Sequence, residues 1–188
     1  MVYKTVELAD GRKATLDWLK KEDIAEVLQV LNDVIKEGRY LFMNNEITDM
    51  ENELQWFERA TKEGMLYLTA RIDGKLVGGA SIHRQTDKHG HVASYGIFIG
   101  KNYRNLGLGT LLTKEFVEIA KKQELEILRL SVYASNERAL HVYKKCGFRE
   151  AGRLTNGIKF LDGTYTDEIL MELLLKQVRA MKKLRMQL

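Results

Sequence analysis

Residues 97–109 read Ile-Phe-Ile-Gly-Lys-Asn-Tyr-Arg-Asn-Leu-Gly-Leu-Gly, and this stretch decides the fold that the sequence predicts. Its apolar start, Ile97 to Ile99, is typical of a strand, and the glycine-spaced segment after it predicts a turn that opens a helix. Glycine allows a backbone close to a ligand, and the first N–H groups of a helix lie unpaired at the positive end of its dipole. The stretch therefore favours an anion-binding turn able to hold a pyrophosphate, although ordinary strand-to-helix turns share this glycine spacing.

The composition indicates one cytoplasmic domain. With 188 residues, 45% of them hydrophobic, the chain can bury its own core, and we expect a single domain over 1–188 with a core at about 13–174. No run approaches 18 apolar residues and no basic-then-apolar leader follows Met1, so we expect no membrane span, no export and a cytoplasmic location. Because Cys146 is the single cysteine, we expect neither an internal disulfide nor a metal site.

The formal charge of +4 is concentrated at the C-terminal end. From Met171 onward the sequence has five basic residues and one acidic residue, Glu172, which accounts for the whole excess of positive charge. Residues 1–170 are therefore formally balanced, and no nucleic-acid partner is expected. Apolar residues recur on one helical stripe from Val178 to Leu188. Residues 175–188 therefore predict an amphipathic basic helix. We expect this helix to dock on its own domain or on a second copy in a homodimer. A protein or ribosome partner and an anionic membrane surface are the alternative contacts.

Alternating and continuous apolar runs predict the strands. Asp-Gly dipeptides at 10–11 and 73–74 favour tight reversals, and the runs around them predict two hairpins. Further strands are predicted at 91–99, at 127–132 and, around Asp162-Gly163, at the end of the chain. The strand at 127–132 is expected to lie parallel to the one before it, because a helix separates them. The predicted hairpin and closing strands cover 2–8, 12–18, 66–72, 75–83, 149–158 and 165–174.

Apolar residues three and four positions apart predict four helices. The first two cover 20–37 and 49–63, and the segment between them, Arg39 to Thr48, has no period and is expected to be a loop. The third begins after the glycine turn and carries Leu108 to Ile119, and the fourth covers 136–145.

Two motifs together resemble one family. Tyr103 to Gly109 resembles the Arg/Gln-x-x-Gly-x-Gly/Ala motif of the GCN5-related N-acetyltransferases, the GNAT superfamily. Asn136 to Phe148 looks like the second signature of that family, Asn-x-x-Ala-x-x-x-Tyr-x-x-x-Gly-Phe, and follows in the expected order. The resemblance implies an α/β (α+β) fold with a mixed, mostly antiparallel sheet of six to seven strands. It also implies that the fourth and fifth strands splay apart and that about four helices, plus the C-terminal one, flank the sheet.

The resemblance also implies acetyl-CoA as co-substrate, held between the splayed strands. In this sequence the backbone of Ile97, Phe98 and Ile99 would bond the pantetheine amides. The pyrophosphate would lie on the turn and helix start formed by Arg104, Asn105, Leu106, Gly107, Leu108, Gly109 and Thr110. A solvated surface role is the alternative for Arg104.

For the chemistry, the resemblance implies that Asn136 contacts the cofactor and that Tyr143 donates a proton to the leaving thiolate. These two residues are seven apart and share a helix face. A helix cap is the alternative for Asn136 and a core ring is the alternative for Tyr143. Cys146 is interpreted as a small apolar residue rather than a nucleophile.

The general base is not evident from the sequence. Several relatives carry a glutamate on the strand before the glycine turn, but here Ser94 occupies that place. Serine is not a base unaided, so either a carboxylate from Glu37, Glu46 or Asp167 acts, or a water held by Ser94 carries the proton.

The acceptor is expected to be a small amine or an amino-acid-like molecule. Tyr40 and Phe42 lie in the aperiodic segment and are predicted to wall the acceptor site. Residues 32–57 faintly resemble the phosphinothricin-type and the ribosomal-protein acetyltransferases. A protein N-terminus or lysine, a polyamine, and a non-catalytic CoA-binding or RNA-associated module stay open as alternatives.

Overall fold

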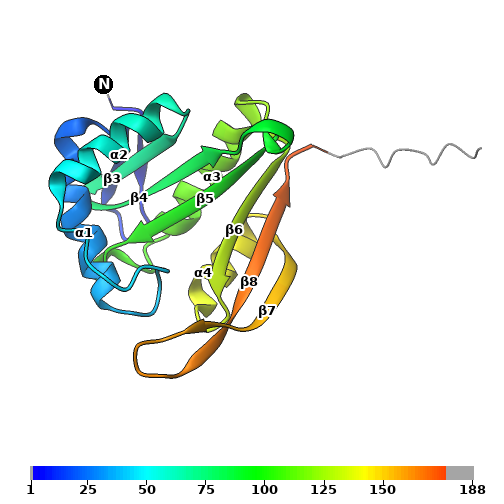
Figure 1. The fold of residues 1–188 in the computed structure, drawn as a ribbon. Helices are drawn as coiled ribbons and strands as arrows, with labels where there is room; N and C mark the ends of the chain where they lie inside the picture. The colour runs from blue at the N-terminus through cyan, green and yellow to red at the C-terminus, as the bar shows by residue number, and fades with distance from the viewer. Residues whose placement is uncertain (1, 177–188) are drawn as a thin grey trace, which may run out of the picture.

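The computed structural model describes residues 2–176, and these contain one sheet of eight strands (Figure 1). The spatial order is β1-β2-β3-β4-β5-β6-β8-β7, and all neighbours are antiparallel except β5 and β6. The expected six to seven strands become eight because both strands of the N-terminal hairpin join the sheet. The strand bounds are Lys4–Glu7 (β1), Lys13–Trp18 (β2), Leu66–Ile72 (β3), Lys75–Arg84 (β4), Val92–Ile99 (β5), Ile127–Tyr133 (β6), Arg149–Lys159 (β7) and Tyr165–Leu174 (β8).

Four helices cover the two faces of the sheet (Figure 1). They are α1 (Ile24–Lys36), α2 (Met50–Lys62), α3 (Leu108–Lys122) and α4 (Glu137–Lys145), close to the predicted bounds. Successive side chains of β5 point to opposite faces of the sheet, so their contacts show on which face α1 and α3 lie. Phe98 packs with Val27 and Val34 of α1, whereas Tyr95, three residues earlier and so on the opposite face, packs against the α3 ring of Phe116. We call these the α1 face and the α3 face.

The two central strands separate soon after they meet. β5 and β6 pair only through Val92–Ser94 and Ile127–Arg129, and beyond these residues they diverge (Figure 1). On its other side β5 stays paired with β4 from Ala93 to Ile99. The expected splay is thereby confirmed, and in chain order it involves the fifth and sixth strands because two hairpins precede β5.

The predicted C-terminal helix, 175–188, falls almost wholly on residues 177–188, which lie outside the described residues. Leu175, just beyond β8, donates its N–H to the carbonyl of Glu126 at 2.8 Å. Because residues 177–188 are not described, a single domain over 1–188 stays a prediction. Within residues 2–176 no helix is both long and apolar enough to cross a membrane.

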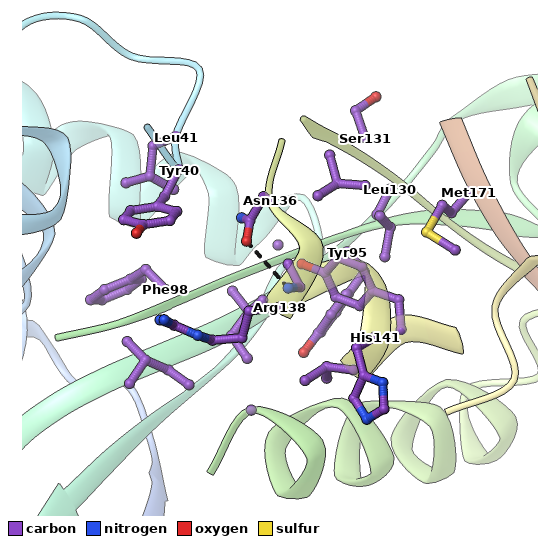
Figure 2. A pocket seen from close by; sticks show the side chains of 18 of the residues that line it. Tyr40, Leu41, Tyr95, Phe98, Leu130, Ser131, Asn136, Arg138, His141 and Met171 are labelled. Carbon is purple, nitrogen blue, oxygen red and sulfur yellow. Dashed lines mark hydrogen bonds between the residues drawn. The ribbon is translucent and has the colours of Figure 1, made fainter. Parts of the chain in front are cut away.

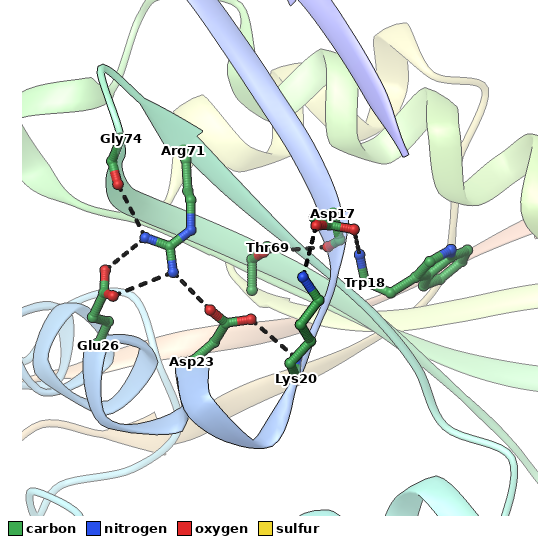
Figure 3. Close-up of polar contacts among 8 residues, drawn as sticks. All are labelled: Asp17, Trp18, Lys20, Asp23, Glu26, Thr69, Arg71 and Gly74. Atoms are coloured by element: carbon green, nitrogen blue, oxygen red, sulfur yellow. Dashed lines mark hydrogen bonds and ion pairs between the residues drawn. The ribbon is translucent and has the colours of Figure 1, made fainter. Parts of the chain in front are cut away.

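A charged network fixes the start of α1 to the edge of the β3–β4 hairpin (Figure 3). The Arg71 guanidinium contacts Asp23 and Glu26, each at 2.7 Å, and donates to the carbonyl of Gly74 at 3.0 Å. Asp23 in turn accepts the backbone N–H of Lys20 at 3.0 Å. Only 23% of the Arg71 side chain is exposed, so this network is partly shielded from solvent and holds α1 in position against the sheet.

Replacing Arg71 with Met should lower the free energy of unfolding by about 1–2 kcal/mol, because the half-buried Asp23 carboxylate loses its partner. Urea denaturation followed by circular dichroism measures this. Lys21→Met is the matched control, since it breaks a pair with Glu58 in which both side chains are more than half exposed, and it should change stability by less than about 0.5 kcal/mol. Equal effects of the two variants would contradict a positioning role for Arg71.

Candidate active site

The gap between β5 and β6 opens into a cavity of about 1370 Å³ that crosses the sheet. Its walls come from β5, β6, β7, β8, the turn before α3, α4 and the loop after α1. From Tyr95 onward the edge of β5 that faces β6 has no strand partner, so its N–H and C=O groups are available to an extended ligand. Of the residues predicted to bind the cofactor on this strand, Ile97, Phe98 and Ile99 all line the cavity.

The turn before α3 has the backbone that an anion site needs. Asn105 and Gly107 adopt left-handed conformations, with φ of 64° and 85°, and so turn the chain sharply into the helix. The first α-helical hydrogen bond runs from the N–H of Leu111 to the carbonyl of Gly107. The N–H groups of Leu108, Gly109 and Thr110 have no backbone acceptor among residues 2–176, and Gly109 and Thr110 line the cavity. Leu108 is buried beneath, and Leu106 is not part of the lining.

Two hydroxyl groups tie this helix start to β5. The Tyr95 hydroxyl lies 3.0 Å from the Thr113 hydroxyl, which donates to the carbonyl of Gly109 at 2.7 Å. Both side chains are buried. These hydrogen bonds connect the start of α3 to β5. They therefore hold the unpaired N–H groups of α3 at a fixed distance from the strand edge.

Arg104 is not the solvated surface arginine that the sequence left open. Its side chain is 11% exposed, and its guanidinium contacts the Glu37 carboxylate through both terminal nitrogens, one at 2.8 Å. Its Nε–H donates to the carbonyl of Ile99 at 3.0 Å, and the Tyr40 ring lies 4.5 Å from its guanidinium carbon. Arg104 thus joins β5, the end of α1 and the loop after α1, and it borders the cavity with its charge partly neutralised.

Asn136 and Tyr143 line the cavity from the α4 side, and Figure 2 labels Asn136. The Asn136 Oδ1 accepts the N–H of Ala139 at 3.2 Å, so this residue caps α4 and also lines the cavity. Tyr143 packs against Tyr95 and Phe148, and burial raises the pKa of its phenol well above its ordinary value. Among residues 2–176 the Tyr143 hydroxyl has no hydrogen-bond partner. No side-chain polar atom in this part of the chain is both fully buried and unpaired, so the Tyr143 hydroxyl is open to the cavity, where it is a protonated donor.

Cys146 packs between α4 and the start of α3. Its sulfur lies 3.9 Å from the carbonyl of Thr110, and burial raises the pKa of the thiol. A neutral, half-buried thiol is a packing group rather than a nucleophile.

The three carboxylates predicted as alternative bases are all engaged in ion pairs. Glu37 holds Arg104, and Glu46 contacts Lys36 at 3.1 Å outside the cavity. Asp167 accepts the N–H of Asn156 and pairs with Arg153, and these contacts lower the pKa of its carboxyl. Neither Glu46 nor Asp167 lines the cavity, so both are poorly placed as the base.

Ser94 is exposed on β5 and faces the cavity at the point where β5 and β6 separate. Two further carboxylates, Glu150 and Glu172, also line the cavity. Sequence reasoning missed them because only the pairing of β8 with β6 and with β7 brings them to the gap. Among residues 2–176 no group of three or more His, Cys, Asp or Glu side chains is arranged to hold a metal ion.

The loop after α1 closes one side of the cavity. Phe42 contacts Tyr133 of β6 edge to face, with ring centroids 4.8 Å apart, and the Tyr133 hydroxyl donates to the carbonyl of Leu41. Tyr40, Leu41 and Phe42 all line the cavity (Figure 2 labels the first two). The loop therefore bridges the two strands that the gap separates. Arg129, Arg138 and His141, which also line the cavity, were not identified from the sequence as site residues.

Comparisons with known proteins agree with this geometry. Residues 14–148 match the model of the acetyltransferase (GNAT) family. The L-amino acid N-acetyltransferase AaaT of Escherichia coli is 34% identical over 121 residues, which are 62% of this chain and 73% of that protein. The L-amino acid N-acyltransferase MnaT of Escherichia coli is 23% identical over 87% of this chain and 95% of its own length.

A solved structure shows the likeness of fold. The phosphinothricin acetyltransferase of Sinorhizobium meliloti, solved in complex with acetyl-CoA, superimposes with a TM-score of 0.81 at 17% identity, over 90% of this chain and 92% of that one. The family match extends over both motifs and over the diverging strands. The chain therefore belongs to the GNAT acetyltransferase family and is an N-acetyltransferase.

Proposed function

We propose that this protein moves an acetyl group from acetyl-CoA to the primary amine of a small, amino-acid-like acceptor, by direct attack within a ternary complex. The observation that carries the proposal is the unpaired edge of β5, which leads from the unpaired N–H groups of α3 to the Tyr143 hydroxyl. The relatives named as L-amino acid acetyl- and acyltransferases support the choice of acceptor.

Acetyl-CoA supplies the thioester. Its pyrophosphate would rest on the N–H groups of Gly109 and Thr110, and the pantetheine amides would bond the free edge of β5. Arg104 is proposed to support this site chiefly by fixing the turn, because its guanidinium already contacts Glu37. Asn136 caps α4 at the wall of the same site.

In the transfer step the neutral amine forms the new N–C bond and the C–S bond breaks. The leaving thiolate takes a proton from Tyr143, and the amine loses its proton to solvent or to a carboxylate through a water beside Ser94. Holding both reactants in one cavity makes the attack effectively unimolecular. Backbone N–H groups on the open edge of β5 would stabilise the developing oxyanion.

A polyamine acceptor is less well supported than an amino-acid-like one. A polyamine needs an acidic mouth, yet Glu37 and Glu46 are neutralised by Arg104 and Lys36. Asp49 and Glu53 line a separate small hollow beside α2, not the cavity of the gap. Protein N-termini and lysines stay alternative acceptors, and a homodimer and the absence of a nucleic-acid partner stay predictions.

The direct experiment incubates the protein with acetyl-CoA and single amines, and follows thiol release together with the mass of the product. The panel contains L-amino acids, spermidine, and a peptide with a free N-terminus. Acetylated L-amino acids are expected as the main products. Thiol release at the acceptor-free rate with every amine would overturn the proposal.

Tyr143→Phe should lower turnover about a hundredfold, because the thiolate loses its proton donor, while the Kd of acetyl-CoA stays within twofold. Stopped-flow thiol release and calorimetry measure the two quantities. Tyr67→Phe is the control, since it removes a hydroxyl from a half-buried ring that does not line the cavity. Unchanged turnover in Tyr143→Phe, with chemistry limiting the rate, would leave Tyr143 as a core ring only.

Gly109→Val should weaken acetyl-CoA binding at least tenfold. A Cβ at this position would lie at ordinary contact distances, 3.4 Å from Ile99 and 3.8 Å from Val142, and the larger Val side chain should narrow the cavity beside the proposed pyrophosphate site. Gly107 is unsuitable for this test, because its φ of 85° would strain any side chain. Calorimetry on Gly109→Val and the smaller Gly109→Ala gives the answer, and parental affinity in a folded Val variant would mean that the phosphate site is misplaced.

Phe42→Ala should raise the KM of the acceptor more than that of acetyl-CoA, because Phe42 walls the acceptor side through its contact with Tyr133. Steady-state kinetics with each substrate varied in turn make the comparison. Leu161→Ala, at a side chain 81% exposed and outside the cavity, should change neither constant. Equal changes in both KM values for Phe42→Ala would move the acceptor site elsewhere.

A further inference from the structure

A row of polar side chains crosses the closed end of the gap. Strand register places Ser94 opposite Arg129, Arg129 opposite Glu172, and Glu172 opposite Arg149. Residues opposite one another in paired strands present their side chains on the same face. Because Tyr95 faces α3, its neighbour Ser94 and the rest of the row lie on the α1 face, and all four line the cavity.

Arg129 is the cation of this row that has no partner within the described residues. Arg149 contacts Glu172 at 3.0 Å, and Arg104, across the gap, contacts Glu37. Arg129 has neither an ion pair nor a side-chain hydrogen bond to any residue from 2 to 176, although Glu172 is its neighbour on β8. Glu172 is held by Arg149, so the Arg129 guanidinium remains available to an anion in the cavity.

The position of Arg129 restricts which anion it would meet. It lies next to Ser94, where β5 and β6 part and where the free edge of β5 begins. The other unpaired arginine of the cavity, Arg138, stands beside Asn136 at the start of α4, on the cofactor side. An anionic group near Arg129 therefore belongs to the acceptor rather than to the phosphates at α3.

We propose that Arg129 binds the α-carboxylate of the acceptor, and that the site thereby selects α-amino acids over amines without this group. The inference rests on the proposed function and adds the group that the site recognises. A guanidinium meets a carboxylate through two parallel hydrogen bonds, which fixes orientation as well as affinity. The α-amine is one carbon from that carboxylate, so holding the carboxylate at Arg129 presents the amine to the open edge of β5.

The test compares L-methionine with two analogues that lack the carboxylate, L-methioninamide and 3-(methylsulfanyl)propylamine. The amide has a less basic amine than methionine and the decarboxylated compound has a more basic one, so an effect shared by both does not come from amine basicity. Full-length protein should prefer L-methionine by at least thirtyfold in kcat/KM. Arg129→Gln should abolish that preference, leave the KM of acetyl-CoA unchanged, and be partly restored in Arg129→Lys.

Arg153→Gln is the matched control, because this arginine lies on β7, pairs with Glu150 and Asp167, and does not line the cavity. It should keep the preference of the parent protein. Calorimetric titration of L-methionine into the protein saturated with CoA gives a readout independent of turnover, and Arg129→Gln should weaken that binding by the same factor.

Two results would overturn the proposal in distinguishable ways. Acetylation of the two analogues as efficiently as L-methionine, or an unchanged preference in Arg129→Gln, would refute the role of Arg129 and leave the transferase function intact. Acetylation of none of the three compounds, with no binding of L-methionine to the CoA complex, would refute the amino-acid acceptor itself.

Discussion

The organisation of the site depends on one constraint, the end of pairing between β5 and β6 after Ser94 and Arg129. A strand edge left unpaired inside a protein needs a partner, because buried N–H and C=O groups without hydrogen bonds are costly. Here that edge borders a cavity instead of another strand. A ligand that carries amides along an extended chain satisfies such an edge, and this is the physical reason for placing the pantetheine there.

The surrounding contacts keep the gap open at a defined width. The Tyr95–Thr113–Gly109 hydrogen bonds fix the start of α3 to β5 on one face. On the other face Arg104 and Glu37 join the glycine turn to the end of α1. The loop after α1 then reaches across to Tyr133 of β6. The proposed phosphate turn and the proposed acceptor wall are therefore parts of one connected structure, joined through the contact of Arg104 with Tyr40.

Much of this architecture follows from local sequence. The periods of the helices and strands, and the Asp-Gly turns, predicted nearly every element within a few residues. The two motifs predicted the turn before α3 and the shared face of Asn136 and Tyr143. These features depend on residues close together in the chain, where spacing alone determines which side chains meet.

What the sequence did not predict depends on contacts between distant residues. Arg104 and Glu37 are 67 positions apart, and no local pattern distinguishes this glutamate from the others on the surface of α1. The row from Ser94 to Arg149 exists only because β8 lies between β6 and β7 in this register. A shift of one residue would turn the side chains of the shifted strand to the other face of the sheet. For the same reason Glu46 and Asp167 were weighed as bases, although both are engaged outside the cavity.

Amide hydrogen exchange, read residue by residue by NMR with and without acetyl-CoA, tests the central claim most directly. If acetyl-CoA occupies the gap, exchange should slow at those amides between Tyr95 and Ile99 that do not pair with β4, and at Gly109 and Thr110, while the β1–β2 hairpin stays unchanged. Unaltered exchange at these β5 and α3 amides in protein saturated with acetyl-CoA would contradict the account.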